Sequence, residues 1–519
     1  MSAKIQIELI PLGVTLDVER GTALQTILAM HGVEFPCGGS SNCGGCRVQV
    51  IEGRLKPTAE DKALFSEEEL AVGWRLACRA CAEGPLKLKV DQWTMPILAD
   101  NESPSGARRK GLAMAIDLGT TTIVAQLLDL ESGKLLGLRS ALNPQAAHGA
   151  DLISRVRFAL DSDVLTSLIR EFLGVMVHDL ATGREDEIVE VVLVGNAVMH
   201  HLFCGLDVKP LSHAPFESPN NDEQRFTSNK LKWKLPGSSR IRFLPSIGAF
   251  VGSDILAGIV AVRLGSGRSL RALIDLGTNG EIALGNEQRI LCASTAAGTA
   301  FEAGSITMGM RAATGAISRV FVDNAKLRCS VIGNAEPRGI CGSGLVDAVA
   351  AGLDTGAILP NGRLANGARE FPITGDVRLS QHDIRQLQLA KGAIATGLRI
   401  LLKRWGAGIN DIAAVYLSGA FGNYVRPESA VRIGLLETPL NRLVASGNTA
   451  LRGAKFLIGE DRYSALDIIE HVSLAPDPQF QNTFIASLAF PQPQAGMLQQ
   501  TFPSTSSLRG DNASGSDRM

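Results

Sequence analysis

Leu273-Ile-Asp-Leu-Gly-Thr-Asn-Gly-Glu281 is nearly the same phrase as an earlier stretch of the chain, Ala115-Ile-Asp-Leu-Gly-Thr-Thr-Thr122. In each copy a short apolar run ends in an Asp-Leu-Gly-Thr turn, and a second apolar run follows. One such turn is weak evidence, but two of them, about 158 residues apart, indicate an internal duplication. From Leu112 to about residue 475, apolar runs alternate with helical segments, which is typical of α/β layers. The sequence therefore predicts two related α/β lobes.

The two turns have the composition of a phosphate site. A hairpin turn of Gly and Thr presents backbone N–H groups and hydroxyls to phosphate oxygens. Mg²⁺ prefers carboxylate oxygen and keeps much of its hydration shell, so we expect Asp117 and Asp275 to hold it through water during catalysis. Two facing turns would clamp one nucleoside triphosphate, although each turn alone is also explained as a tight turn of an α/β protein. The residues expected at the phosphates are Gly119, Thr120 and Thr121 in the first turn and Gly277, Thr278 and Asn279 in the second.

Three further segments suit a position beside a nucleotide. Val194-Gly-Asn196 is a strand entering a helix, and Asn196 is expected to contact phosphate, water or a partner. Gly298–Glu302 and Gly339–Gly344 are glycine-rich turns before helices, where free backbone N–H groups favour phosphate. Glu281 and Glu302 are the candidates for orienting an attacking water molecule.

Two other features have a competing structural explanation. The pair His200-His201 suggests a metal or cobalt ligand, but neighbouring residues on a helix point in different directions, which favours packing. Cys341 is interpreted as a small packed residue, with a redox role as the alternative.

Three of the nine cysteines lie in one glycine-rich loop, Cys37-Gly-Gly-Ser-Ser-Asn-Cys-Gly-Gly-Cys46, and another follows in Trp74-Arg-Leu-Ala-Cys78. Four thiolates suit a zinc ion or an iron–sulfur cluster. Structural zinc sites normally use paired cysteine knuckles, whereas three close cysteines and one distant cysteine are typical of a [2Fe–2S] ferredoxin. The glycines allow the loop to wrap around a cluster and to point backbone amides at its sulfurs. Cys81 leaves open which cysteine completes the set.

Composition excludes some classes of function. A chain of 519 residues predicts two to four domains, and a formal net charge of −1 argues against general nucleic-acid binding. The first 13 residues alternate like a strand and lack the pattern of a signal peptide, and no apolar run reaches about 18 residues. These features predict a cytoplasmic protein with neither nucleic acid nor membrane as a partner, in which clustered cysteines are metal ligands or redox thiols.

Changes in composition suggest the domain boundaries. We expect a cysteine-loop domain over residues 1–95, a polar and basic linker over 96–110, a two-lobed domain over 111–480 and a disordered Pro/Gln/Ser-rich tail over 481–519. The elements expected in the first domain are strands Ile5–Ile10, Val14–Val18, Arg47–Ile51 and Leu86–Val90, and helices Ala23–His31 and Ala59–Val72, the latter with Thr58 as N-cap.

The first domain resembles the adrenodoxin-like [2Fe–2S] ferredoxins in its cysteine loop and in Arg75-Leu-Ala-Cys78. The resemblance implies an α+β ferredoxin domain of the β-grasp type. It also favours Cys78 over Cys81, because the Arg-Leu-Ala context precedes Cys78. The cluster ligands that the resemblance implies are Cys37, Cys43, Cys46 and Cys78.

The second domain resembles the superfamily of actin, sugar kinases and heat-shock chaperone ATPases. The resemblance is carried by the paired Asp-Leu-Gly-Thr turns and by the late segment Ser418-Gly-Ala-Phe-Gly422. It implies a two-lobed α/β, actin-like ATPase domain with duplicated ribonuclease-H-like cores that binds ATP with Mg²⁺. Gly419 and Gly422 would then lie against the adenosine.

The whole arrangement resembles the reductive activators of corrinoid proteins, which join a ferredoxin to such an ATPase. The resemblance spans residues 1 to about 480. It implies an ATP-hydrolysing activase that passes an electron from its [2Fe–2S] cluster to the inactive Co(II) corrinoid of a methyltransferase system, restoring Co(I). The implied partners are a corrinoid protein or cobalamin-dependent methyltransferase and a cellular electron donor, and a homodimer stays open. Longer members carry an extra small domain after the ferredoxin, where this chain has about fifteen residues.

Two other functions compete with this interpretation. One is a small-molecule kinase whose activity is gated by a [2Fe–2S] redox sensor, although the sequence has no clear sugar-binding pattern. The other is a ferredoxin-type electron carrier with an inactive ATPase fold, against which the intact Asp117 and Asp275 argue.

Overall fold

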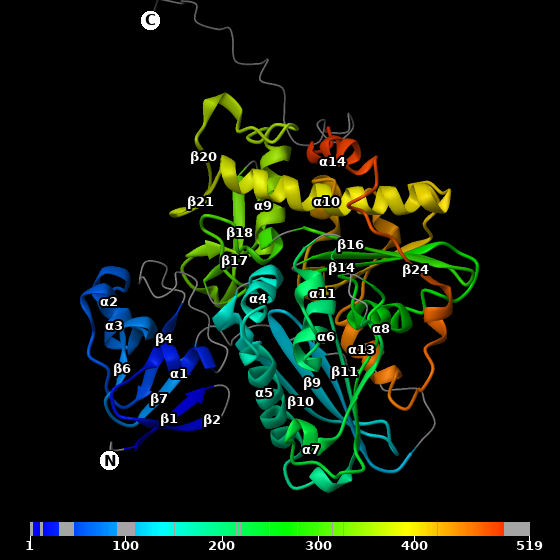
Figure 1. Cartoon of the computed structure of the whole chain (residues 1–519). Coiled ribbons are helices and arrows are strands. Elements are labelled where there is room, and N and C mark those ends of the chain that lie inside the picture. The colour runs from blue at the N-terminus through cyan, green and yellow to red at the C-terminus, as the bar shows by residue number, and fades with distance from the viewer. Residues whose placement is uncertain are drawn as a thin grey trace, which may run out of the picture.

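The protein consists of a small N-terminal domain beside two larger lobes (Figure 1). Over the described residues, no helix combines the length and the apolar character that a membrane crossing requires. The computed structural model describes residues 4–10, 14–30, 46–90, 109–149, 151–213, 216, 220–248, 250–277, 279–297, 299–313, 315–324, 326–422 and 424–492.

The N-terminal domain has the predicted β-grasp fold. Its five-stranded sheet has the order β2-β1-β7-β4-β5, and β1 runs parallel to β7 while the other pairs are antiparallel. Alternating residues such as Ile7 and Leu9 point into the core, where helix α1 (Leu24–Met30) packs on the sheet. The strands are β1 (Lys4–Ile10), β2 (Val14–Glu19), β4 (Arg47–Glu52), β5 (Trp74–Leu76) and β7 (Leu86–Val90), with the short pair β3 (Thr22–Ala23) and β6 (Cys81–Ala82).

The stretch expected as the second helix of this domain is two helices, so that expectation was wrong. Thr58 caps α2 (Ala59–Leu64), as predicted. The chain then leaves the helix at Phe65, whose ring is buried in the core, and Ser66 starts α3 (Glu67–Ala71) with a capping box of its own. A capping box satisfies backbone donors at a new helix start, and here it outweighs continuation of one long helix.

Both lobes contain a six-stranded sheet, and five strands of each share one arrangement. The orders are β10-β9-β8-β11-β13-β12 in the first lobe and β23-β22-β14-β15-β16-β24 in the second. In each lobe three consecutive antiparallel strands are followed by two that lie parallel beside the first. This correspondence confirms the duplication predicted from the repeated turns.

The strand bounds of the two sheets follow. The first sheet contains β8 (Leu112–Leu118), β9 (Thr122–Asp129), β10 (Leu135–Leu142), β11 (Ile188–Gly195), β12 (Gln224–Phe226) and β13 (Arg240–Phe243). The second contains β14 (Arg271–Leu276), β15 (Gly280–Gly285), β16 (Ile290–Thr295), β22 (Ala414–Ser418), β23 (Leu443–Ala445) and β24 (Ile469–His471).

Two helices cross between the lobes. Helix α8 (Ser253–Ala261) follows the first sheet but buries its apolar face against β14, β15 and β16 of the second. Helix α13 (Thr449–Phe456) follows the second sheet but packs on β8 and β11 of the first. The two helices touch closely, since a Cβ at Gly453 would lie 1.9 Å from the Ala257 carbonyl oxygen. Each lobe therefore contributes a helix start to the other lobe's acidic turn.

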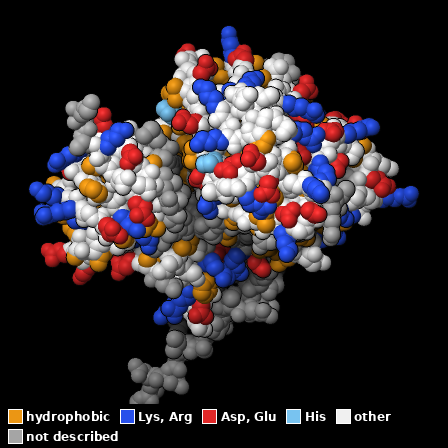
Figure 2. Space-filling view, turned by 90° about the horizontal axis from the view of Figure 1, so that it is seen from below, with side chains coloured by type: hydrophobic (Ala, Val, Ile, Leu, Met, Phe, Trp, Pro, Cys, Tyr) orange, Lys and Arg blue, Asp and Glu red, His pale blue; other side chains and the backbone are white. Residues whose placement is uncertain are grey.

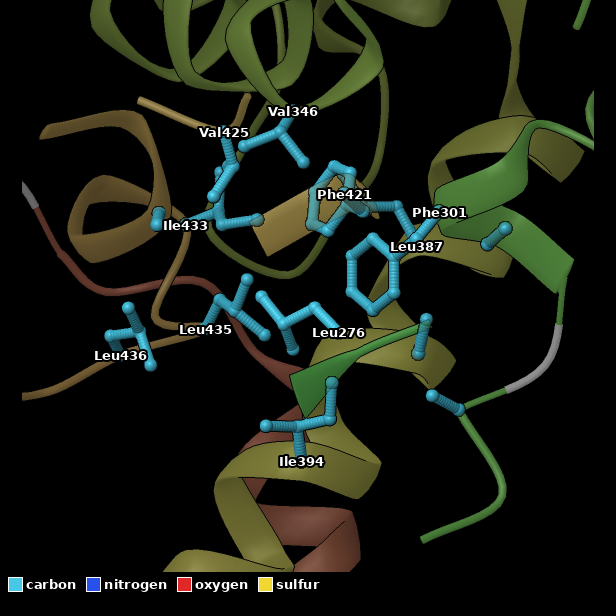
Figure 3. Packing of buried hydrophobic residues seen from close by; sticks show 14 of the residues in the cluster. Leu276, Phe301, Val346, Leu387, Ile394, Phe421, Val425, Ile433, Leu435 and Leu436 are labelled. Atoms are coloured by element: carbon cyan, nitrogen blue, oxygen red, sulfur yellow. The ribbon is translucent and has the colours of Figure 1, made fainter. Parts of the chain in front are cut away.

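Further helices cover the sheets. Figure 3 shows the core of the second lobe, where the stacked rings of Phe301 and Phe421, 4.5 Å apart, lie near Leu276 and Ile394. The helices are α4 (Leu152–Ala159), α5 (Val164–Ala181), α6 (Ala197–Cys204) and α7 (Ser228–Leu231) in the first lobe and α9 (Gly342–Asp354), α10 (Gln381–Trp405), α11 (Gly419–Gly422) and α12 (Pro427–Arg432) in the second. Two small sheets, β17 (Ala316–Asp323) with β18 (Lys326–Val331) and β19 (Gly339–Ile340), and β20 (Glu370–Thr374) with β21 (Val377–Ser380), complete the second lobe.

The C-terminal part of the described chain is helical where a tail was expected. Helix α14 (Phe480–Leu488) lies along α10, and Lys391 of α10 donates to the Ala489 carbonyl oxygen. Phe490 is buried, so the expectation of a disordered tail from 481 onward is not met over 481–492. The rest of that expectation lies outside the described residues, as does most of the linker predicted over 96–110.

Candidate functional site

The repeated Asp-Leu-Gly-Thr stretches are hairpin turns, as predicted. They join β8 to β9 and β14 to β15. The Gly119 N–H donates to the Thr122 carbonyl oxygen at 3.2 Å, and the Gly277 N–H donates to the Asn279 carbonyl oxygen at 3.1 Å. Thr278 lies outside the described residues. In both turns the glycine N–H closes the hairpin, but the first turn has four residues between the last paired residues of its strands and the second has three.

Asp117 stands at the end of β8 and is held by a residue of the other lobe. Asn448, the N-cap of α13, donates its Nδ2 to Asp117 Oδ2 at 2.8 Å. Burial raises the pKa of Asp117 to about 7, the hydrogen bond from Asn448 opposes that rise, and the Asp275 carboxylate adds to it. A cation bound nearby would favour the ionised form of this carboxylate.

Asp275 occupies the matching position on β14. Ser418 Oγ donates to Asp275 Oδ2 at 2.6 Å, and burial raises the pKa of Asp275 while this hydrogen bond opposes the rise. The next residue, Gly419, has φ +83°, and a Cβ there would lie 2.6 Å from Asp275 Oδ1. The glycine is therefore required by the close approach of β22 to the acidic turn.

Glu281 lies on β15 next to these aspartates. It is buried, and burial together with the charges of Asp254 and Asp275 raises its pKa well above the usual range, while a hydrogen bond from Asn279 opposes the rise. Asn279 therefore contacts Glu281, in addition to its predicted position in the turn. The three residues expected to be catalytic, Asp117, Asp275 and Glu281, come from both lobes and lie within electrostatic range of one another.

Asp254 joins this cluster and was missed by the sequence reasoning. It is in the first turn of α8, where its Oδ1 accepts the Ile255 N–H at 2.8 Å. Burial, then the charges of Asp275 and Asp117, raise the pKa of Asp254 to about 8. A Cβ at Gly252 would lie 2.3 Å from the Gly195 carbonyl oxygen, so the helix start is pressed against the end of β11. The Gly-Ser-Asp helix start was the available signal.

The four carboxylates of Asp117, Asp254, Asp275 and Glu281 fit a bound cation. Like charges that are buried together repel one another. The raised pKa of each of these carboxyl groups indicates that its neighbours do not fully offset the cost of its negative charge. In the parts of the chain that the structure describes, no three His, Cys, Asp or Glu side chains are close enough to ligate a metal directly. This combination suits a hydrated Mg²⁺ that meets the carboxylates partly through water.

The first turn is braced from both lobes. Asn196, the N-cap of α6, donates its Nδ2 to Thr120 Oγ1 at 2.9 Å. Thr121 Oγ1 donates to Glu302 Oε1 of the second lobe at 3.3 Å. Burial lowers the pKa of Arg155 to about 10, and the nearby Glu302 opposes that fall. The structure therefore brings Thr120, Thr121 and Asn196 together, and it adds Arg155, which the sequence did not suggest.

The glycine-rich turns allow close packing of the backbone, in addition to their predicted position beside a nucleotide. A Cβ at Gly342 would lie 1.8 Å from the Phe301 carbonyl oxygen, and one at Gly344 would lie 2.2 Å from that of Ile317. Within the described residues no side chain caps α9, so its first N–H groups remain available to an anion. Gly422 ends α11 with only ordinary contacts around an added Cβ.

The histidine pair is part of the core. Both side chains are fully buried on α6, and the His200 ring meets that of Phe243 edge-on at 5.0 Å. Burial lowers the pKa of His200 to about 4 and lowers that of His201. Their burial and the contact with Phe243 favour the packing interpretation. Cys341 is likewise buried, with its Sγ 3.3 Å from Ser343 Oγ.

The predicted cluster ligands are described in part. Cys37 and Cys43 lie outside the described residues. Cys46 is buried at the start of β4, and its carbonyl oxygen accepts the N–H of Ala77 at 3.0 Å, next to Cys78. Cys78 packs against the core of the domain, whereas Cys81 is exposed on β6. The backbone at Cys46 thus lies next to that at Cys78, and the assignment of Cys78 as the fourth ligand stays a prediction.

Three family models match the chain in order. The first is described as a 2Fe-2S iron-sulfur cluster binding domain and matches residues 7–83. The second, the RACo middle region, matches residues 112–267. The third, the C-terminal domain of RACo, the ASKHA domain, matches residues 269–502. The boundary between the last two coincides with the boundary between the lobes.

Two curated proteins and one solved structure resemble most of the chain. The corrinoid activation enzyme RamQ of Eubacterium limosum is 35% identical over 428 residues, which cover 75% of this chain and 72% of that protein. The [Co(II) methylated amine-specific corrinoid protein] reductase of Methanosarcina barkeri is 27% identical and covers 73% and 76%. The structure of a reductive activator for corrinoid,iron-sulfur protein has a TM-score of 0.64 at 24% identity, covering 96% of this chain and 100% of that one.

Proposed function

The chain belongs to the family of reductive activators of corrinoid proteins, and from this premise we propose that it couples ATP turnover at the acidic turns to electron delivery from its ferredoxin domain. The electron acceptor is the Co(II) corrinoid of a partner protein, as the names of the relatives indicate for those proteins. The product is the Co(I) corrinoid, which is the state that accepts a methyl group.

One observation carries this proposal. Four carboxylates come from both lobes, and charges within this group raise the pKa of Asp117, Asp254 and Glu281. Closing the lobes on Mg²⁺ and a triphosphate would neutralise that repulsion, so the bound nucleotide stabilises the closed arrangement. A ligand shifts an equilibrium between open and closed lobes only when it binds the two states with different affinities. The charge cluster would supply that difference, because its repulsion is relieved when Mg²⁺ binds.

Energy coupling explains why an electron carrier is joined to an ATPase. A plant-type [2Fe–2S] centre has a potential near −400 mV, and each ~59 mV of uphill one-electron transfer costs about 1.4 kcal/mol. When bound, the cluster supplies the capacity to carry one electron, and Cys46 and Cys78 would hold it together with Cys37 and Cys43. Transfer to an acceptor of lower potential needs a second, downhill reaction.

Different residues of the ATPase domain have different roles in nucleotide binding and hydrolysis. Asp117 and Asp275 hold the hydrated Mg²⁺, positioned by Asn448 and Ser418. Backbone N–H groups of the two turns bind phosphate, and Asn196 and Glu302 keep the hydroxyls of the first turn in place. Glu281 orients the attacking water and takes up its proton, a role that its raised pKa suits.

An anaerobic assay with a Co(II) corrinoid protein and a chemical reductant tests the proposal. We expect ATP hydrolysis and the absorbance of Co(I) to appear together in the wild-type protein. Asp275→Asn should leave reduction of the cluster intact and abolish ATP-dependent formation of Co(I). Asp129→Asn, a substitution at the exposed end of β9, is the matched control and should behave as wild type.

Other outcomes identify the competing functions. ATP consumption with a phosphorylated small product and no Co(I) would favour the redox-gated kinase. Reduction of the corrinoid without any ATP turnover would favour the plain electron carrier. Equal loss of cluster reduction and of Co(I) formation in Asp275→Asn would contradict the division of labour between the domains.

A further inference from the structure

Glu69 of the ferredoxin domain lies between arginines of two different domains. Its Oε1 is 3.3 Å from Arg47 Nη2 of the same domain. The same oxygen is 4.0 Å from Arg338 Nη2 of the second lobe. One carboxylate oxygen is thus shared across the domain boundary, which in Figure 1 is where α3 approaches the β17 end of the second lobe.

The Arg47 side of this contact reaches the predicted cluster ligands. Arg47 directly follows Cys46 and pairs with Leu76 across β4 and β5, two residues before Cys78. Its guanidinium is almost fully buried and stacks 3.8 Å from the centre of the Trp74 ring. A buried, stacked arginine has little freedom to move. Arg47 therefore holds Glu69 at a fixed position relative to Cys46, the residue that precedes Arg47.

The Arg338 side reaches the glycine-rich turn at the nucleotide site. Arg338 directly precedes β19, and its backbone N–H donates to the Gly315 carbonyl oxygen at 2.9 Å. β19 lies parallel to β17 and leads without a loop into α9, whose start at Gly342 is pressed against the Phe301 backbone. Only three residues separate Arg338 from the start of α9, so a shift of that helix start would reach Arg338 along a short path.

The carboxylate between them is fixed by its own helix. Glu69 Oε2 accepts the Ser66 N–H at 3.1 Å as part of the capping box of α3. This leaves Oε1 directed at the two arginines. Acidic and basic side chains are interspersed over the face shown in Figure 2, without a broad area of one sign on either body. The ferredoxin domain touches the first lobe where α1 lies against the turn Pro144–His148, and the Glu69–Arg338 pair adds a charged contact with the second lobe.

We propose that the Glu69–Arg338 contact docks the ferredoxin domain on the second lobe and that nucleotide binding at the glycine-rich turn releases it. The release half of this inference rests on the proposed function, because it requires a nucleotide at α9, whereas the docking half does not. Without this contact, the charged link between Glu69 and the second lobe is lost. The docked position holds α3 and the neighbouring Arg47 beside the second lobe, and the released position leaves the ferredoxin domain free to meet a corrinoid partner.

Hydrogen–deuterium exchange on the full, cluster-loaded chain tests both halves. In the wild-type protein, ATP with Mg²⁺ should raise the exchange rate of the α3 segment Glu67–Ala71 at least twofold. Arg338→Gln should show the raised rate without nucleotide and no further change with it. Arg338→Lys retains the positive charge and should restore most of the protection.

Matched controls separate docking from general effects of charge. Arg328→Gln removes an exposed arginine of β18, and Glu67→Gln removes an exposed carboxylate of α3; both should exchange as wild type. Raising the salt concentration from about 50 to 300 mM should mimic Arg338→Gln, because screening weakens an exposed ion pair. The visible spectrum of the cluster should be unchanged in every variant, which shows that the domain is folded.

Each failure has a distinct meaning. Wild-type protection of α3 in Arg338→Gln would overturn the docking contact. Nucleotide that binds in equilibrium dialysis but leaves α3 protection unchanged would overturn the release. Absence of nucleotide binding in the wild-type protein would refute the proposed function, and with it the release, while the result for Arg338→Gln without nucleotide would still decide the docking.

Discussion

Asp254→Asn should stabilise the nucleotide-free protein, and more so as the pH rises. The pKa of Asp254 is raised to about 8 by burial and by the neighbouring carboxylates. A raised pKa means that the folded state binds more protons than the unfolded state between about pH 4 and pH 8. Stability is therefore lost as the pH rises through that window. Asparagine removes the titrating group while its Oδ1 can still accept the Ile255 N–H.

The size of the effect follows from the shift. Between pH 5.5 and pH 8, the cost of keeping this carboxyl group protonated grows by about 2.5 pH units, or about 3 kcal/mol at 1.36 kcal/mol per unit. The group is partly exposed and shares its repulsion with Asp117 and Asp275, so we expect about 2 kcal/mol. For a domain of this size that corresponds to a gain in Tm about 4–8 °C larger at pH 8 than at pH 5.5.

Thermal unfolding of wild type and Asp254→Asn at the two pH values, without metal or nucleotide, measures this difference. Asp129→Asn is the matched control, because the pKa of Asp129 is lowered by its hydrogen bonds to Ser132 and the Glu131 backbone and it lies outside the cluster. That control should lose stability or stay unchanged. An equal Tm gain for Asp254→Asn at both pH values, or a wild-type protein that is more stable at pH 8, would refute the charge-cluster reasoning.

Two further predictions concern the ligand assignment and the positioning of Asp117. Cys78→Ser should abolish the visible absorbance of the cluster, and Cys81→Ser should preserve it; the reverse pattern would assign the fourth ligand to Cys81. Asn448→Ser keeps an N-cap for α13 but loses the amide donor to Asp117. A hydrogen bond to a charged group contributes about 1.5 kcal/mol, which corresponds to about one pKa unit. The acid limb of the pH profile of ATP turnover should therefore move up by about one pH unit. An unmoved profile in a folded Asn448→Ser protein would contradict that role.

The parts of the site that sequence reasoning predicted are local in the chain. Asp117 and Asp275 each stand two residues before a glycine in a hairpin turn, and the repetition of that phrase was enough to predict two lobes. Cys46 was predicted as a cluster ligand from the local spacing of the cysteine loop, and Cys78 from a resemblance to ferredoxins; both stay predictions. A short pattern of this type predicts its turn well, because the residues within a turn determine the geometry of that turn.

The parts that were missed come from contacts over long sequence separations. Asn448 reaches Asp117 across 331 residues, and Asp254 reaches Asp275 because α8 packs on the opposite sheet. The local signals, an Asn at a helix cap and the Gly-Ser-Asp start of α8, are weak, because such residues are common at helix starts for reasons of helix stability alone. Their role appears only when the exchange of α8 and α13 between the lobes is known.

That exchange also explains how the two halves of the duplication differ. Each acidic turn receives the start of the helix that follows the other lobe's sheet. Asp117 accepts a hydrogen bond from Asn448 at the start of α13, whereas Asp275 accepts one from Ser418 of its own lobe. The start of α8 brings Asp254, a carboxylate whose pKa is raised by the charges of both Asp275 and Asp117. Three carboxylates, Asp254, Asp275 and Glu281, therefore lie on the side of the second turn, and we expect a bound cation to stabilise that side most.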